Sequence, residues 1–215
     1  MCNSNSSRVR YWVSRSLSLS GIAAPPVLGV FIILATVLNP GYSNISETVS
    51  QLGIKGRPHP EVMNAGFIFY GLLINGFAYS LYLRLGKSKG AKLVWFMLAM
   101  HGLSIILTGT FQANPDTPES VSMLENTMHQ FFAQLGFWSL TVGVLIFGRA
   151  VRLKSSWRGF RQFSIAVVAF NLLSGLLFMM EFSEQIEGLL QRSIYAVSLF
   201  WIEIVSMRSL RVHDQ

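Results

Sequence analysis

The sequence predicts an all-α integral membrane protein whose six transmembrane helices form a bundle, with both termini in the cytoplasm. First, 51% of the 215 residues are hydrophobic and only 13% are charged, about half the charge of an ordinary soluble domain. Second, the charges gather in short patches between apolar runs of about 20 residues, the length that crosses a bilayer. Third, Lys and Arg residues concentrate in alternate loops.

Each apolar run is predicted to be one helix. The first follows Arg8, Arg10 and Arg15, as a signal peptide would, but no small-residue cleavage site precedes the break at residues 39–41, so we interpret it as a retained helix. The second and fourth runs contain more polar residues, as helices facing a bundle interior do, and the third and fifth are the most uniformly apolar. The six predicted segments are residues 17–38, 61–83, 91–111, 127–147, 160–180 and 189–205.

The distribution of basic residues predicts the orientation. Fourteen of the 17 Lys and Arg residues lie at the N-terminus, in the second and fourth loops, or at the C-terminus. The positive-inside rule places these parts in the cytoplasm. We therefore predict a multi-pass protein of the plasma (inner) membrane, with a cytoplasmic N-terminus (1–16), a six-helix membrane domain (17–206) and a cytoplasmic tail (207–215).

The positive charge does not indicate nucleic-acid binding, because the basic residues flank apolar segments and form no folded basic face. The lipid bilayer is the predicted partner. Cys2 is the only cysteine, which excludes disulfides within the chain and cysteine-based zinc sites.

The first outer loop, residues 39–60, contains signals for a short amphipathic helix. Pro40-Gly41 favours a turn, Asn44 with Glu47 three residues later is typical of a helix cap, and Gly53 of a helix end. Between them, Ile45, Val49 and Leu52 form one apolar stripe. These spacings predict a helix over residues 44–52 that packs on the bundle or on the membrane surface.

Polar residues line up on one face of several predicted membrane helices. Interhelical hydrogen bonds would account for most of them. His101 lies near the bilayer centre, where a histidine is more often hydrogen-bonded in the core than bound to a ligand. His129 lies near the outer end of its helix, on the same side as Asp116 and the first loop. The residues in these stripes are Asn64, Gly71 and Asn75; His101, Ser104, Thr108 and Gln112; Asn126, His129, Gln130 and Gln134; Ser164, Asn171 and Ser174; and Gln191, Tyr195 and Ser198.

Three short motifs stand out in the loops and at one helix start. They are Pro40-Gly41-Tyr42-Ser43 followed by Val49-Ser50-Gln51-Leu52-Gly53, then Gly109-Thr110-Phe111 with Asp116 shortly after, and Met128-His129 at the start of the fourth helix. These motifs resemble those of the family known as domain of unknown function 998. The resemblance covers nearly the whole membrane region. It implies a six-helix bacterial or archaeal membrane protein and supplies no mechanism.

Three classes of function remain open. The first is an envelope hydrolase or lipid-modifying enzyme, with Ser50 or Ser43 as nucleophile, His129 as base and Asp116 or Glu47 orienting it. Substrate contacts would then come from Ser43, Glu47, Gln130, Gln134, His101 and Asn75. The second is a transporter or small-molecule-binding protein that uses the polar stripes around His101 and Asn75. The third is a non-catalytic membrane partner or assembly factor that docks another protein through its outer loops.

The sequence does not identify a cofactor. A metal site formed by His59, His129 and Asp116 lacks any recognised ligand spacing, and a haem bound by His101 and His129 would need ligands at one depth. The geometric prediction shared by the enzyme and ligand classes is one polar pocket at the outer ends of the second to fourth helices. Ser50, Asp116, His129 and Gln130 would line it.

Overall fold

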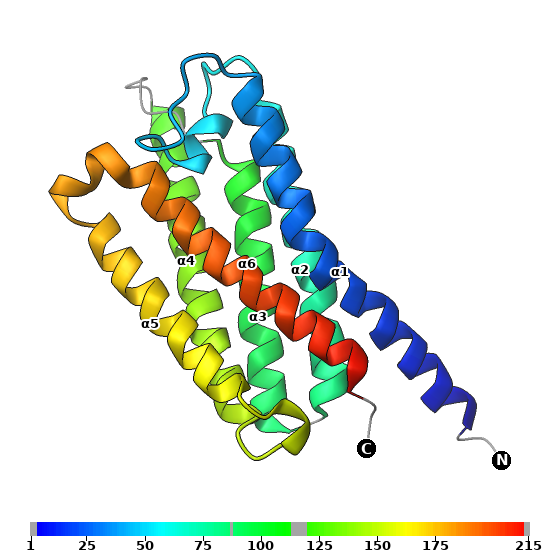
Figure 1. Cartoon of the computed structure of the whole chain (residues 1–215). Helices are drawn as coiled ribbons and strands as arrows, with labels where there is room; N and C mark the ends of the chain where they lie inside the picture. The colour runs from blue at the N-terminus through cyan, green and yellow to red at the C-terminus, as the bar shows by residue number, and fades with distance from the viewer. Residues whose placement is uncertain (1–3, 87, 113–119, 213–215) are drawn as a thin grey trace.

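The computed structural model describes residues 4–86, 88–112 and 120–212, and in these ranges every regular element is helical. Six long helices form the bundle shown in Figure 1. Each is long and apolar enough to cross a membrane, so the chain is a multi-pass membrane protein. The long helices are α1 (Ser4–Val37), α2 (Pro60–Leu85), α3 (Lys89–Thr110), α4 (Ser120–Ala150), α5 (Phe160–Phe178) and α6 (Glu187–Arg211).

Three short 3₁₀ helices lie in the connections: η1 (Val49–Gly53), η2 (Ser155–Trp157) and η3 (Glu181–Ile186). The bundle has two distinct ends. α1 begins and α6 ends at one of them, together with the loop between α4 and α5 (Figure 1). The opposite end carries the long loop between α1 and α2 with its η1 helix, and we call it the η1 end.

Small residues allow the central helices to approach closely. A Cβ atom at Gly71 of α2 would overlap the carbonyl oxygen of Gly102 in α3, and one at Gly109 of α3 would lie 2.7 Å from the carbonyl oxygen of Asn64. Such contacts between backbones are how membrane helices gain packing energy without a hydrophobic driving force. The α2–α3 pair is therefore the tightly packed centre of the bundle.

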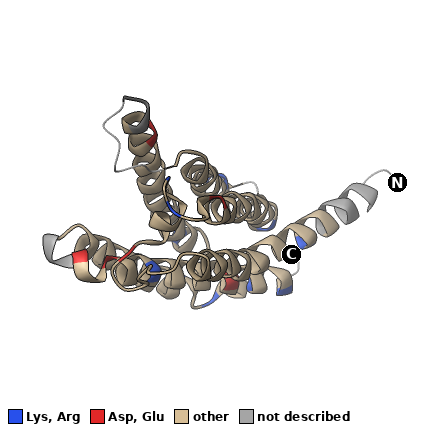
Figure 2. Ribbon diagram, turned by 90° about the horizontal axis from the view of Figure 1, so that it is seen from above, with Lys and Arg blue, Asp and Glu red and all other residues tan. Residues whose placement is uncertain are grey.

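Hydroxyl groups join α1, α2 and α6 at the opposite end from η1. Ser18 Oγ lies 2.6 Å from Ser80 Oγ and 3.1 Å from Ser209 Oγ, and the Ser80 hydroxyl donates to the carbonyl oxygen of Ser14. All four residues are buried. Because buried hydroxyl groups cannot bond to water, these groups satisfy one another. Figure 2 shows how few charged residues the bundle carries, as burial in lipid requires.

Candidate functional site

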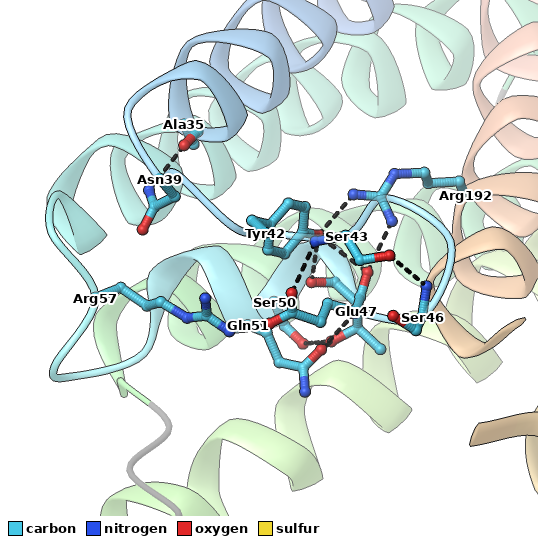
Figure 3. Close-up of polar contacts among 11 residues, drawn as sticks. Ala35, Asn39, Tyr42, Ser43, Ser46, Glu47, Ser50, Gln51, Arg57 and Arg192 are labelled. Carbon is cyan, nitrogen blue, oxygen red and sulfur yellow. Dashed lines mark hydrogen bonds and ion pairs between the residues drawn. The ribbon is translucent and has the colours of Figure 1, made fainter. Parts of the chain in front are cut away.

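The first loop is folded against the start of α6, and Arg192 is the residue that holds it there (Figure 3). One guanidinium nitrogen donates to the carbonyl oxygens of Asn44 and Glu47, both at 2.9 Å. The other donates to the Tyr42 hydroxyl at 2.6 Å and to the Asn44 side-chain oxygen at 2.9 Å. Arg192 thus supplies partners for loop carbonyls that no helix satisfies. We call this set of contacts the Arg192 clamp.

Tyr42 is the centre of the clamp. Its hydroxyl donates to the carbonyl oxygens of Glu47 (3.0 Å) and Thr48 (2.7 Å) while accepting from Arg192. The guanidinium groups of Arg57 and Arg192 lie 5.8 Å and 5.5 Å from the centre of its ring. Burial raises the pKa of Tyr42, and the hydrogen bond from Arg192 opposes that rise. The phenol is therefore neutral and a hydrogen-bond donor at ordinary pH.

Glu47 organises the rest of the loop. One carboxylate oxygen accepts from the Ser43 N–H at 2.8 Å and the other pairs with Arg57. Ser43 in turn accepts from the Ser46 N–H through its hydroxyl. The loop is thus held by internal bonds in addition to its contacts with α6. Ser43 and Glu47, predicted as substrate contacts, have these partners in the structure.

Only the second part of the predicted loop helix is helical. Residues 44–46 form turns and η1 covers Val49–Gly53. Val49 and Leu52 are buried, whereas Ile45 is 58% exposed. The Val49 N–H donates to the Gln191 side-chain oxygen at 2.6 Å, and the Leu189 N–H donates to the Ile45 carbonyl oxygen at 2.9 Å. Bonds to α6 thus replace the intrahelical bonds that a longer helix would have made.

A cavity of about 70 Å³ lies in the bundle beneath η1. Ser50 of η1 lines it, as do His101 of α3 and polar residues of α2, α5 and α6. The wall is otherwise mainly apolar. Its polar lining residues are Ser50, Tyr70, His101, Thr108, Asn171, Gln191, Tyr195 and Ser198. The cavity therefore joins the first loop to the deep histidine.

The hydrogen bonds of His101 indicate the tautomer of its neutral ring. Nδ1 lies 2.9 Å from the Gly136 carbonyl oxygen, which can only accept, so Nδ1 carries the proton. In the neutral ring Nε2 is then an acceptor, and the Tyr70 hydroxyl donates to it at 3.1 Å. Both residues are buried. The lone pairs of the Tyr70 oxygen remain available to a ligand in the cavity.

A groove of about 290 Å³ on the side of the bundle adjoins this cavity. α4, α5 and α6 form its walls, and some of its lining side chains are exposed, including Gln134 and Met179. Cavity and groove share Ala133, Phe137, Gln191, Ile194 and Tyr195. The side chains of this shared set therefore lie between the cavity and the groove.

The structure brings some of the predicted site residues together and keeps others apart. Ser50 and His101 line the same cavity, and Gln134 lines the groove. Asn75 donates to the Gly71 carbonyl oxygen at the α2–α3 contact, Gln130 is exposed, and His59 pairs with Glu61 on the surface. Asp116 lies outside the described residues.

His129 holds the end of α3. Its Nδ1 lies 3.0 Å from the Thr108 carbonyl oxygen and 2.8 Å from that of Phe111, so this nitrogen donates to both. Carbonyls at a helix C-terminus lack partners within the helix. Within the described ranges no hydrogen bond joins His129 to Ser50, whose hydroxyl lies 3.0 Å from that of Thr48. Among the same residues, no three His, Cys, Asp or Glu side chains are close enough to bind a metal.

Comparison with known families agrees with the motifs around the first loop. The family described as "Protein of unknown function (DUF998)" matches residues 22–208. The chain belongs to this family. No curated protein and no solved structure matches the chain. The matched region contains the Arg192 clamp, the cavity and the groove, so all three lie within the DUF998 region.

Sequence reasoning missed several residues of this DUF998 site. Arg192 was given no role, although a lone arginine just inside a membrane helix signals a buried partner. Tyr42 appeared only as part of a motif. Tyr70 was not singled out, because tyrosine is common in apolar cores and only the position of His101 gives it a role.

Proposed function

We propose that this protein lies in the plasma membrane with both termini in the cytoplasm, and that residues 17–206 form its membrane domain between the segments 1–16 and 207–215. The excess of Lys and Arg residues at the end where α1 begins supports this orientation. The test uses single cysteines in the 149–161 loop of a Cys2→Ser variant. Impermeant maleimide should label them only after the membrane is permeabilised. Labelling in intact cells would overturn the orientation.

We further propose that the bundle binds a small amphipathic molecule that enters sideways from the lipid. The observation that carries this proposal is the shared wall between the polar cavity and the lateral groove. A rotamer change in Phe137 or Tyr195 would connect the two spaces. Ligand sites in helix bundles have this character, a mainly apolar pocket with a few convergent polar groups.

The two volumes indicate the shape of the ligand. About 70 Å³ accommodates roughly two water molecules at about 30 Å³ each, so the cavity holds a small polar group such as a hydroxyl or carboxyl. The Tyr70 oxygen and the Asn171–Ser198 pair, bonded at 3.0 Å, lie in its wall. The groove of about 290 Å³ has room for a short length of hydrocarbon. A molecule with a polar head and an alkyl chain fits both.

The test is photocrosslinking of the purified protein with a diazirine analogue of palmitic acid. Ala133→Phe fills the wall that cavity and groove share and should reduce crosslinking at α4 and α6 by at least tenfold. Ala196→Phe is the matched control, because Ala196 lies on α6 and is exposed. Equal crosslinking in the two variants, or crosslinks spread evenly over all helices, would refute the proposal.

An enzyme remains the second candidate, because the Ser50 hydroxyl lies in the cavity wall. In this proposal Ser50 is the nucleophile of a hydrolase or lipid-modifying enzyme, with His129 and Asp116 as base and orienting acid. Ser50→Ala would then abolish turnover of a bound ester while leaving crosslinking unchanged. Unchanged turnover would exclude Ser50. If the outer loops instead dock a protein partner, the complex with that partner should persist in both the Ser50→Ala and the Ala133→Phe variants.

A further inference from the structure

The loop between α4 and α5 forms a second, separate pocket at the end of the bundle opposite η1. It has a volume of about 280 Å³ and is lined by four cationic residues, Arg152, Lys154, Arg158 and Arg161. Leu153 and Trp157 also line it, and no carboxylate does. A hollow surrounded by four cations differs from the flat basic fringe that ordinarily marks the cytoplasmic side.

The pocket is rigidly supported from below. Trp157 is buried and packs edge-to-face against Phe147 and Phe160, with ring centres 5.2 Å and 5.1 Å apart. Arg208 of α6 donates through Nε to the Ser156 carbonyl oxygen at 2.8 Å. The Lys154 ammonium donates to the Leu85 carbonyl oxygen at 2.9 Å. Contacts with α2, α4, α5 and α6 thus hold η2 and Lys154 in place, and the cations reach the pocket from a fixed backbone.

The charges around the pocket are not balanced within the described part of the chain. There, Arg152, Arg158 and Arg161 are exposed and form no ion pair. α5 begins at Phe160, so the positive end of its dipole adds to the same field. Gly159, with φ +86°, makes the tight turn that brings this helix end to the pocket. Like charges gathered in this way repel one another unless an anion lies among them.

The exposed side chain of Leu153 indicates what kind of anion the pocket binds. Its side chain is 86% exposed and lies on the pocket rim, beside the cations. A large aliphatic side chain exposed at the end of two membrane helices is stable in acyl chains and unfavourable in water. Basic pockets at this level of membrane helices bind anionic head groups. We propose that this pocket binds the phosphate of an anionic phospholipid, with Leu153 against its acyl chains.

The alternative explanation is that these cations only set the topology. The chain provides a matched control, because Lys89 and Lys92 are two exposed cations at the start of another membrane helix at the same end of the bundle. They do not line the pocket. Arg158→Gln/Arg161→Gln and Lys89→Gln/Lys92→Gln therefore remove equal charge from equivalent places, and only the first pair changes the proposed site.

The experiment measures lipid binding to the full-length protein in detergent by native mass spectrometry. The probes are phosphatidylglycerol, phosphatidylcholine and glycerol 3-phosphate. Each cation near a membrane surface changes binding about fivefold. The Arg158/Arg161 variant should therefore bind phosphatidylglycerol about 30-fold more weakly, while the Lys89/Lys92 variant stays within about threefold of the parent. Phosphatidylcholine should bind weakly to all three proteins.

Three results would overturn the proposal: equal losses in the two double variants, equal binding of the two phospholipids, or glycerol 3-phosphate binding as tightly as phosphatidylglycerol. The last would assign the pocket to a soluble phosphate compound. Leu153→Ser provides a further test that keeps every cation and changes only an exposed side chain. It should weaken phosphatidylglycerol binding and leave glycerol 3-phosphate unchanged, and it decides the question even if the arginine variant does not fold.

Discussion

Removal of the Arg192 clamp should release the first loop from α6. We consider Arg192→Met, which keeps much of the side-chain volume and removes all five hydrogen bonds that the guanidinium donates. Four of these go to the first loop, and the fifth goes to the carbonyl oxygen of Gly188 in the same helix. The loop therefore loses its main attachment while α6 itself is little changed.

The size of the effect follows from the environment of the four bonds. Those to Asn44 are exposed, so water replaces them at small cost. Those to Glu47 and Tyr42 are partly buried, and hydrogen bonds to a charged group contribute about 1.5–3 kcal/mol each. Taking the lower value for both gives about 3 kcal/mol for loop opening, or about a 100-fold rise in the open population.

The assay is the rate at which an impermeant maleimide labels Val49→Cys, whose position is fully buried in the closed loop, in a Cys2→Ser background. When the loop recloses faster than it is labelled, this rate is proportional to the open population. Arg192→Met should raise it about 100-fold, and Arg192→Lys less, because lysine keeps the charge but not the planar fork. Lys55→Met is the control, since its exposed pair with Glu125 contributes at most about 1 kcal/mol. If Arg192→Met raises the labelling rate no more than Lys55→Met does, Arg192 does not hold the loop closed.

Three more results are expected. Gly188→Ala should lower the melting temperature measurably, because its Cβ would overlap the Glu47 carbonyl oxygen, whereas Gly29→Ala, with open space around it, should not. Because burial raises the pKa of Tyr42, folding favours the neutral phenol. The stability it contributes should be constant below about pH 10 and fall as pH rises through the raised pKa, which a melting series in parent and Tyr42→Phe would show. His129→Ala should destabilise the protein by about 1–3 kcal/mol by leaving two carbonyls at the C-terminal end of α3 without their donor. His129→Asn, which keeps a donor, should recover part of that loss.

The six helices were predictable because the bilayer fixes the length of apolar chain that each one needs. The residues at which these helices begin and end were harder to predict. The fourth segment was expected from residue 127, yet α4 starts at Ser120, and α6 continues to Arg211, six residues beyond the expected end at 205. Hydrophobicity marks the part of a helix in hydrocarbon, while backbone hydrogen bonding continues into the interface. The apolar pattern therefore predicts the membrane-spanning part of each helix but underestimates the full length of the helix.

The candidate site was predictable only in part, for a related reason. Of the residues in the predicted polar stripes, His101, Ser198 and Gln191 line the cavity, whereas Gln130 and Gln134 of the fourth-helix stripe are exposed. The sequence could not predict which residues of different helices contact each other, because those contacts depend on the rotation and depth of each helix in the bundle. His101 bonds to Tyr70, and no spacing in either helix indicates that contact.

The first loop shows how a neighbouring helix overrides local signals. Its residues have the caps and apolar spacing of a helix over 44–52, but helical bonds would satisfy the same N–H and C=O groups that Gln191 and Arg192 bind. Since those two side chains are already held on α6, the loop gains partners without ordering a full helix. The backbone therefore follows α6 and leaves Ile45 exposed.

The same pair of neighbours links the loop to the cavity. Gln191 lines the cavity and binds the Val49 N–H, while Arg192 clamps the residues just before η1. Opening the loop should therefore expose the cavity from the η1 end, whereas the lateral groove between α4, α5 and α6 does not include the loop. If the ligand enters from lipid, Arg192→Met should leave crosslinking of the palmitic acid probe unchanged and Ala133→Phe should block it. The reverse pattern would mean that the ligand enters past η1 from water.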